Sequence, residues 1–206
     1  YENMFSKSII NSFDIVGFDG RGIGQSQQIR CLDDKAEDSF INLDGSAKTP
    51  SELKNLVSAS KSFAAACSRA AGSKIAHIST LETAKDMEIL RNLLGDAKLN
   101  YLGKSYGTYL GAIYISLFPD KVGRMILDGA IDPNISFAEQ NLTQAASFEI
   151  SLDNYLKKHK EFTKVQIQDL IGKSGNLPLI SSSGRKLNRA LLITAIAASL
   201  YDSNDG

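Results

Sequence analysis

One short segment has the residue types and spacing of a reactive site. Residues 103–107 read GKSYG, which fits the pattern G-x-S-x-G around Ser105. In that pattern the serine lies on a tight turn between a strand and a helix, where its hydroxyl can attack a carbonyl carbon. The backbone N–H of Tyr106, at the start of the helix, could then donate a hydrogen bond to the oxyanion. We therefore interpret Ser105 as a nucleophile and Tyr106 as an oxyanion donor.

Two alternative interpretations of this segment have to be weighed. It could be a glycine-rich turn with an inert serine, or a loop that binds phosphate. The phosphate-binding pattern G-x-x-x-x-G-K-[ST] is absent from the chain. An inert serine is disfavoured because an apolar strand precedes the pattern and an amphipathic helix follows it, which is the setting of a nucleophile turn.

The elements around this segment alternate between strand and helix. Residues 13–18 read FDIVGF, an apolar run before a glycine-rich turn, which predicts a buried parallel strand. Further strands are predicted over residues 99–102 and 122–127, with a helix over residues 106–118 between them that ends at Pro119. This order predicts an α/β fold with a parallel sheet and flanking helices.

Two more helices are predicted before the reactive segment. Residues 51–71 have apolar side chains at three- and four-residue steps. A second helix follows Ser79, which forms a capping box with Glu82, and it ends at Gly95. Residues 31–50 have no usable period, so we expect a surface excursion there.

The pattern changes after Pro133. From about residue 136 to residue 200 only helical periodicities are found, separated by a loop over residues 172–184. We expect residues 1–133 to form the N-terminal part of an α/β core. Residues 134–206 are expected to form an all-helical cap that is itself incomplete.

Composition excludes several classes of partner. The chain has 206 residues, of which 43% are hydrophobic, and its 23 basic residues balance 23 acidic ones without a dense basic cluster. We therefore expect neither a nucleic acid nor an anionic membrane as partner. The longest apolar stretch, residues 190–200, is shorter than the roughly 20 residues of a membrane span. No Cys/His/Asp set has metal-site spacing, so neither metal nor cofactor is expected.

Three segments carry a resemblance to a known family. Residues 18–26 read FDGRGIGQS, residues 100–111 read NYLGKSYGTYLG, and residues 122–133 read VGRMILDGAIDP. They resemble the secreted tripeptidyl and prolyl aminopeptidase group of bacterial α/β-hydrolases, closely over about residues 13–133 and faintly afterwards. The resemblance implies an exported hydrolase in which Ser105 attacks a peptide or ester carbonyl and forms an acyl-enzyme that water resolves.

The resemblance also bears on the cysteines and on the turn after the first predicted strand. Cys31 and Cys67, the only cysteines, match a pair usual in these exported enzymes, which implies a disulfide formed in an oxidising compartment. Two reduced thiols are the alternative. Most members of the group have proline where this chain has Gly20, a change that loosens the turn without touching the chemistry.

The remaining catalytic groups are expected outside this chain. The group's acid and histidine follow the cap, so we expect both after Gly206, and the loop that supplies a second oxyanion N–H is expected before Tyr1. The chain starts without Met or a signal pattern, so we expect that any secretory signal was removed or never included. Of its two histidines, His77 is expected at a helix end and His159 on a solvated helix face. By itself the chain is expected to be inactive.

Five further charged residues are candidates for the site. Asp128 occupies a place where some hydrolases of this fold carry their acid, but turn and cap hydrogen bonds are the favoured role for it and for Asp132. Arg21 could anchor a substrate, but it is expected to bind backbone carbonyls and nearby carboxylates. Glu139 and Glu149 could bind a substrate amine, since such aminopeptidases place carboxylates in the cap. Exposed helical positions are the alternative for both.

Three functions remain to be distinguished. The leading hypothesis is an exported serine peptidase that releases residues or short peptides from peptide N-termini. The second is a carboxylesterase or lipase with the same nucleophile turn, since the cap shapes the pocket more than the turn does. The third is a non-catalytic binding module that kept the fold, against which the intact G-x-S-x-G pattern argues.

Overall fold

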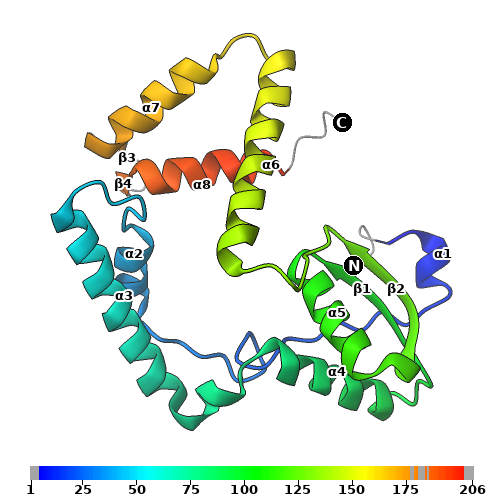
Figure 1. The fold of residues 1–206 in the computed structure, drawn as a ribbon. Coiled ribbons are helices and arrows are strands. Elements are labelled where there is room, and N and C mark those ends of the chain that lie inside the picture. The colour runs from blue at the N-terminus through cyan, green and yellow to red at the C-terminus, as the bar shows by residue number, and fades with distance from the viewer. Residues whose placement is uncertain (1–4, 177–178, 181–183, 185, 202–206) are drawn as a thin grey trace.

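The segment around Ser105 lies in a β-α-β unit, coloured green in Figure 1. The structure, a computed structural model, describes residues 5–176, 179–180, 184 and 186–201. The unit consists of β1 (Leu99–Lys104), α5 (Tyr106–Leu117), a short 3-10 turn η2 (Pro119–Lys121) and β2 (Val122–Asp128). The two strands are parallel, with Leu99 opposite Val122 and Lys104 opposite Asp128. The predicted strands at these positions and the helix between them are confirmed.

A second helix, α4 (Thr80–Leu93), packs against α5. Ser79 caps it by accepting a hydrogen bond from the backbone N–H of Glu82, and Gly95 follows its end with a φ of 78°. The predicted helix is therefore confirmed. Its predicted capping box is only half formed, because the Glu82 carboxylate accepts a hydrogen bond from Lys85 and not from the backbone N–H of Ser79. The buried side chains between the two helices form the hydrophobic core with partly buried side chains of the sheet. This core consists of Ala84, Met87, Leu110 and Tyr114.

A polar network joins α4 to α5 at the edge of this core. Tyr114, fully buried, donates a hydrogen bond of 2.7 Å from its hydroxyl to Glu88 Oε2. Arg91, 6% exposed, donates to both oxygens of Glu88 at 2.8 and 2.6 Å. The hydrogen bonds from Arg91, supported by the one from Tyr114, lower the pKa of Glu88 to about 2. Burial raises the pKa of Tyr114 to about 12. The network lets polar groups lie in the helix interface without losing their hydrogen bonds.

The chain before α4 follows an extended path with three helices and a 3-10 turn. These are α1 (Lys7–Ile10), α2 (Asp34–Ile41), α3 (Pro50–Ala71) and η1 (Gly72–His77). The helix predicted over residues 51–71 is confirmed as α3, which begins with a capping box between Thr49 and Glu52. The helix α2, which lies where a surface excursion was expected, was not predicted because its two turns are too short to display a repeated apolar face.

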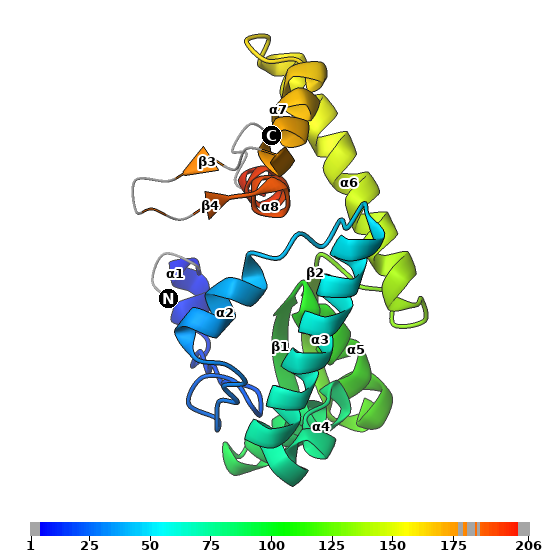
Figure 2. The same ribbon diagram turned by 90° about the vertical axis from the view of Figure 1, so that its left-hand side faces the viewer.

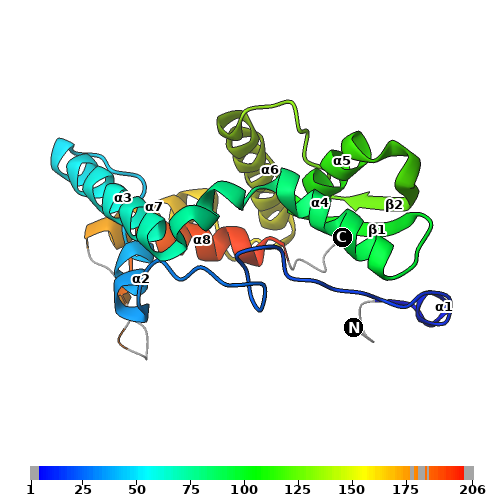
Figure 3. The same ribbon diagram turned by 90° about the horizontal axis from the view of Figure 1, so that it is seen from below.

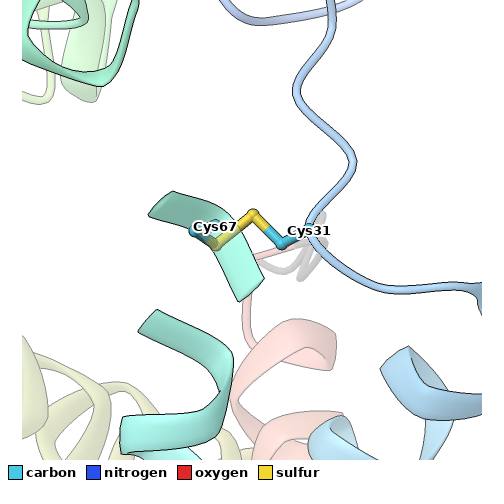
Figure 4. The surroundings of a disulfide bond; sticks show 2 residues. All are labelled: Cys31 and Cys67. Carbon is cyan, nitrogen blue, oxygen red and sulfur yellow. A yellow bond between two sulfur atoms is a disulfide. The ribbon is translucent and has the colours of Figure 1, made fainter. Parts of the chain in front are cut away.

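A disulfide joins Cys31, just before α2, to Cys67 in α3 (Figure 4). The two Cα atoms are 4.4 Å apart and the residues are 36 positions apart in the sequence. The bond fixes the extended segment after the glycine-rich turn against the last third of α3. It closes a loop that contains the whole of α2.

The strand predicted over residues 13–18 is wrong. These residues are extended but pair with no other strand in the described part of the chain. Val16 is 51% exposed and Phe18 is 41% exposed. A strand needs a neighbour that accepts and donates its backbone hydrogen bonds, and an apolar pattern says only that the segment suits a buried position.

The prediction of an all-helical segment after residue 135 is also wrong. The helices α6 (Phe137–Lys158), α7 (Lys164–Asn176) and α8 (Arg189–Ser199) are present. Between α7 and α8, however, β3 (Leu179–Ile180) and β4 (Lys186–Leu187) form an antiparallel pair. Each strand has two residues, which is too short for an alternating pattern to be recognised. The assignment of residues 134–206 to a cap stays a prediction.

The C-terminal helices extend from the β-α-β unit towards α2 and α3 (Figures 1 and 2). Seen from below, α2, α3, α7 and α8 lie on one side and the β-α-β unit with α4 on the other (Figure 3). The guanidinium of Arg189 in α8 donates to Asp44 Oδ2 at 2.9 Å, just after α2. Asn188 donates to the carbonyl of Asn42 in the same loop. None of the described helices is both long and apolar enough to cross a bilayer.

The lowered pKa of Glu88 predicts a pH dependence of stability. Its carboxyl titrates near its ordinary value of 4.5 when unfolded and at about 2 when folded. The stabilisation is therefore fully present above about pH 5 and is lost as the pH falls towards 2. Glu88→Gln should lower the denaturation midpoint at pH 7 and flatten its dependence between about pH 5 and pH 2. Chemical denaturation at a series of pH values measures both effects. The exposed Glu37→Gln is the control, and an unchanged pH dependence in Glu88→Gln would contradict the assignment.

Candidate active site

Ser105 lies on a strained turn between β1 and α5. Its φ is 51° and its ψ is −118°, and Gln27 is the only other non-glycine residue of the described chain with a positive φ. Such a conformation costs on the order of 1–3 kcal/mol and persists only where the surroundings enforce it. The N–H of Ser105 donates to the carbonyl of Asp128 at 2.9 Å, which continues the parallel ladder by one residue. The side chain of Ser105 is exposed and makes no hydrogen bond within the described residues.

Glycines allow the helix and the strand to approach each other at this turn. A Cβ atom on Gly103 would lie 2.4 Å from the carbonyl oxygen of Gly107, and one on Gly111 would lie 2.8 Å from the side chain of Leu127. The ring of Tyr101 lies against Gly103 and Gly111, and its hydroxyl donates to the Gly107 carbonyl at 2.8 Å. Burial raises the pKa of Tyr101. The glycines of the motif therefore make room both for the backbone and for this ring.

Tyr106 occupies the first position of α5. Its backbone N–H has no acceptor within the helix, as is true of all first-turn donors, and it lies at the positive end of the helix dipole. The residue is 51% exposed, and its hydroxyl forms a hydrogen bond of 2.9 Å with Thr80 Oγ1 at the start of α4. The two helix N-termini are thus joined next to Ser105. A donor in this position can stabilise negative charge that develops on an atom bound to Ser105.

The two aspartates considered for the site make local contacts. The carboxylate of Asp128 lies 3.7 Å from the ammonium group of Lys104, and both side chains are exposed. Asp132 Oδ1 accepts hydrogen bonds from the backbone N–H and the side-chain amide of Asn134 at 2.9 and 3.0 Å. Asp132 therefore has the turn role expected for it. Asp128 contributes to the turn through its carbonyl, which binds the N–H of Ser105.

The structure does not bring either histidine into hydrogen-bonding contact with Ser105. His77 ends η1, and its carbonyl accepts a hydrogen bond of 3.0 Å from Arg21. His159 follows α6, a helix about 33 Å long at 1.5 Å per residue, at its far end from the β-α-β unit (Figure 1). Its ring stacks on Tyr155 with centroids 4.1 Å apart and forms a hydrogen bond of 3.3 Å with Glu161.

Arg21 is held by the carboxylates of α4. Its guanidinium donates two hydrogen bonds of 2.6 Å to Asp86 and lies 3.6 Å from Glu82. The hydrogen bond with Asp86 raises the pKa of Arg21. These contacts, together with the one to His77, are the backbone and carboxylate contacts expected from the sequence. They attach the glycine-rich turn to α4.

The cap carboxylates considered as amine binders also have structural partners. Glu139 forms a capping box with Ser136 at the start of α6, and these hydrogen bonds lower its pKa. Glu149 pairs with Lys164 at 2.6 Å and so joins α6 to the start of α7. Within the described residues, no three His, Cys, Asp or Glu side chains are placed to hold a metal ion.

The sequence of this chain is similar to a family model and to several known hydrolases. A family model described as the alpha/beta hydrolase fold matches residues 3–169. The chain belongs to the α/β-hydrolase fold family. It is 38% identical over 140 residues to a tripeptidyl aminopeptidase of Streptomyces lividans, an alignment that covers 67% of this chain. It is 37% identical over 151 residues to the serine protease Hip1 of Mycobacterium tuberculosis, and 38% identical over 149 residues to carboxylesterase B of the same species, covering 72% and 71% of this chain.

The matched part of these relatives is a minor share of their length. The alignments cover 26% of the tripeptidyl aminopeptidase and 29% of each of the other two proteins. The family and the α/β fold class of this chain rest on the family model, which matches most of its residues.

Substitution of Gly103 tests the close approach of α5 to β1. Gly103→Ala should destabilise the protein by about 1–3 kcal/mol, because the new methyl group meets a backbone carbonyl that cannot move without displacing the helix. Gly172→Ala in α7 is the matched control, because among the described residues no atom beyond its own helical turn lies within 4 Å of the added Cβ. The control should be stabilised by about 0.5–1 kcal/mol, since alanine suits a helix better than glycine. Chemical denaturation measures both, and equal stability of the two variants would contradict the packing described.

Proposed function

We propose that this chain carries the nucleophile of an exported serine hydrolase that releases residues or short peptides from peptide N-termini. The observation that carries the proposal is the conformation of Ser105, a non-glycine residue at positive φ with an exposed hydroxyl at the start of a helix. Backbone strain of this kind concentrates at reactive sites. The G-x-S-x-G pattern and the family membership support the same conclusion.

In the proposed reaction, Ser105 Oγ attacks the carbonyl carbon of the scissile bond while a base accepts its proton. The electron pair of the carbonyl moves to its oxygen, and the N–H of Tyr106 donates a hydrogen bond to the resulting oxyanion. Collapse of this intermediate breaks the bond to the leaving amine, which takes up a proton. A water molecule then attacks the carbonyl carbon of the acyl-enzyme while the base accepts one of its protons. Collapse of this second intermediate breaks the ester bond to Ser105, and Ser105 Oγ takes the proton back from the base.

The base, the acid that orients it and a second oxyanion donor are proposed to lie outside these 206 residues. Ser105 makes no side-chain hydrogen bond in the described structure, and His159 is at the distant end of α6. A serine without a base is a poor nucleophile at neutral pH. We therefore expect negligible hydrolysis by this chain alone, since loss of the base costs on the order of a millionfold in turnover and loss of one oxyanion donor a further 100- to 1,000-fold.

Peptides are the proposed substrates because two of the relatives carry peptidase names, tripeptidyl aminopeptidase and serine protease Hip1. Export is supported by the disulfide between Cys31 and Cys67, since such bonds persist in oxidising compartments. Residues 134–206 are proposed to form part of the cap over the site. A carboxylesterase is the second candidate, because carboxylesterase B aligns over a similar share of the chain.

Parallel assays on the protein at its natural length test the proposal. Aminoacyl and tripeptidyl anilides should be hydrolysed with a higher kcat/KM than short acyl esters of comparable size. Ser105→Ala should reduce turnover of both substrate classes by about a millionfold, and Ser147→Ala, at an exposed helical position, should leave it unchanged. The 206-residue chain alone should show no turnover above the Ser105→Ala blank.

Each outcome has a distinct meaning for the proposal. A preference for esters with dependence on Ser105 would replace the peptidase with the carboxylesterase. A folded protein that hydrolyses neither class would favour a binding module. Ser105-dependent turnover by the short chain would show that a base lies within it, and His159→Ala would then be the first variant to examine.

A further inference from the structure

Within the described residues, the carbonyl group of Ser105 accepts two hydrogen bonds, and both come from Thr108. The backbone N–H of Thr108 donates at 2.8 Å, and its side-chain hydroxyl donates at 2.7 Å. Thr108 is 1% exposed, so neither bond competes with bulk water. Its hydroxyl oxygen also accepts a hydrogen bond of 2.9 Å from the N–H of Ile131, in the loop between β2 and α6.

These bonds act on the peptide unit that contains the proposed oxyanion donor. The carbonyl of Ser105 and the N–H of Tyr106 belong to one planar trans peptide unit and point in opposite directions. Fixing the carbonyl therefore fixes the direction of the N–H. The ψ of Ser105, −118°, sets how this plane is rotated relative to the serine side chain. Without the Thr108 bonds, a strained residue would be free to relax that rotation.

We propose that Thr108 is a positioning residue that aims the Tyr106 N–H at the oxyanion formed on Ser105. The proposal rests on the function proposed above. Two donors on the carbonyl also polarise the amide and make its N–H a stronger donor on the opposite side. The bond from Ile131 in turn holds the Thr108 hydroxyl, so the loop leading to α6 helps to set the donor direction.

A threonine elsewhere in the protein makes the same type of bond without this consequence. Thr83 in α4 is 8% exposed, and its hydroxyl donates to the carbonyl of the N-cap residue Ser79 at 3.0 Å. Ser79 has an ordinary extended conformation, with a φ of −146° and a ψ of 159°. Thr83→Val therefore removes a comparable hydroxyl at the start of a neighbouring helix. It provides the matched control for effects on stability alone.

The experiment compares Thr108→Val, Thr108→Ser and Thr83→Val in the protein at its natural length. Thr108→Val keeps the shape of the side chain and removes its hydroxyl, whereas Thr108→Ser keeps the hydroxyl. The measurements are kcat and KM on a tripeptidyl anilide, the second-order rate constant of phosphonylation by a fluorophosphonate, and Tm.

Thr108→Val should lower kcat and the phosphonylation rate by about 10- to 100-fold, with KM within about twofold of the wild type. This loss is smaller than the roughly 100- to 1,000-fold loss that deletion of an oxyanion donor causes, because the donor itself is still present. Thr108→Ser should restore both rates to within about threefold. Thr83→Val should lower Tm by a similar amount to Thr108→Val and leave both rates unchanged. If Thr108→Val does not fold, Thr108→Cys replaces it, because its thiol is a weaker donor of similar size and should give an intermediate rate.

Equal rates for wild type and Thr108→Val, with a lowered Tm, would overturn the proposal and leave Thr108 a purely structural residue. A parallel rise in KM would also overturn it, because an oxyanion donor acts in the transition state and not on substrate binding. Absence of Ser105 phosphonylation in the wild type would instead refute the proposed function. Phosphonylation of the wild-type protein therefore distinguishes failure of the proposed function from failure of the role proposed for Thr108.

Discussion

The close approach of α5 to β1 is the constraint on which the rest of the site depends. A Cβ on Gly103 would lie 2.4 Å from the Gly107 carbonyl oxygen, so the strand and the first turn of the helix could not meet with any larger residue. This proximity leaves one residue, Ser105, to reverse the chain direction, and it does so at a φ of 51°. The strain is balanced locally by the bonds of Ser105 to Asp128 and Thr108, and by the bond from Tyr101 to Gly107. A strained residue stays in its conformation only where several surrounding contacts hold it there.

The helix α4 supports this arrangement by packing against α5. The bonds among Glu88, Arg91 and Tyr114 join α4 to the side of α5 far from Ser105, and the bond between Thr80 and Tyr106 joins the two helices near it. A helix held at both ends presents its first-turn N–H groups in a fixed direction. Preorganised donors of this kind stabilise a transition state without reorganisation at the moment of reaction. The fold thereby links the hydrophobic core to the chemistry proposed for Ser105.

Local signals in the sequence were sufficient for the elements that position the site, but not for those that depend on distant pairing. The strands β1 and β2, the helices α3, α4 and α5, and the roles of Arg21 and Asp132 followed from periodicity, caps and turn chemistry. The strand expected over residues 13–18 failed because a strand requires a partner, which an apolar pattern cannot report. The short pair β3 and β4 left no period to detect. Thr108 was missed because its importance lies in which carbonyl it binds, and the sequence gives no sign of that beyond its place three residues after Ser105.

Ser105 and the backbone N–H of Tyr106 are proposed to form one reactive unit. The most direct measurement is a crystal structure of the protein at its natural length after treatment with a fluorophosphonate. A phosphonyl group is expected on Ser105 Oγ, with its oxygen about 2.7–3.1 Å from the backbone nitrogen of Tyr106. A phosphonyl group attached to another residue, or one on Ser105 whose oxygen points away from the Tyr106 N–H, would contradict it.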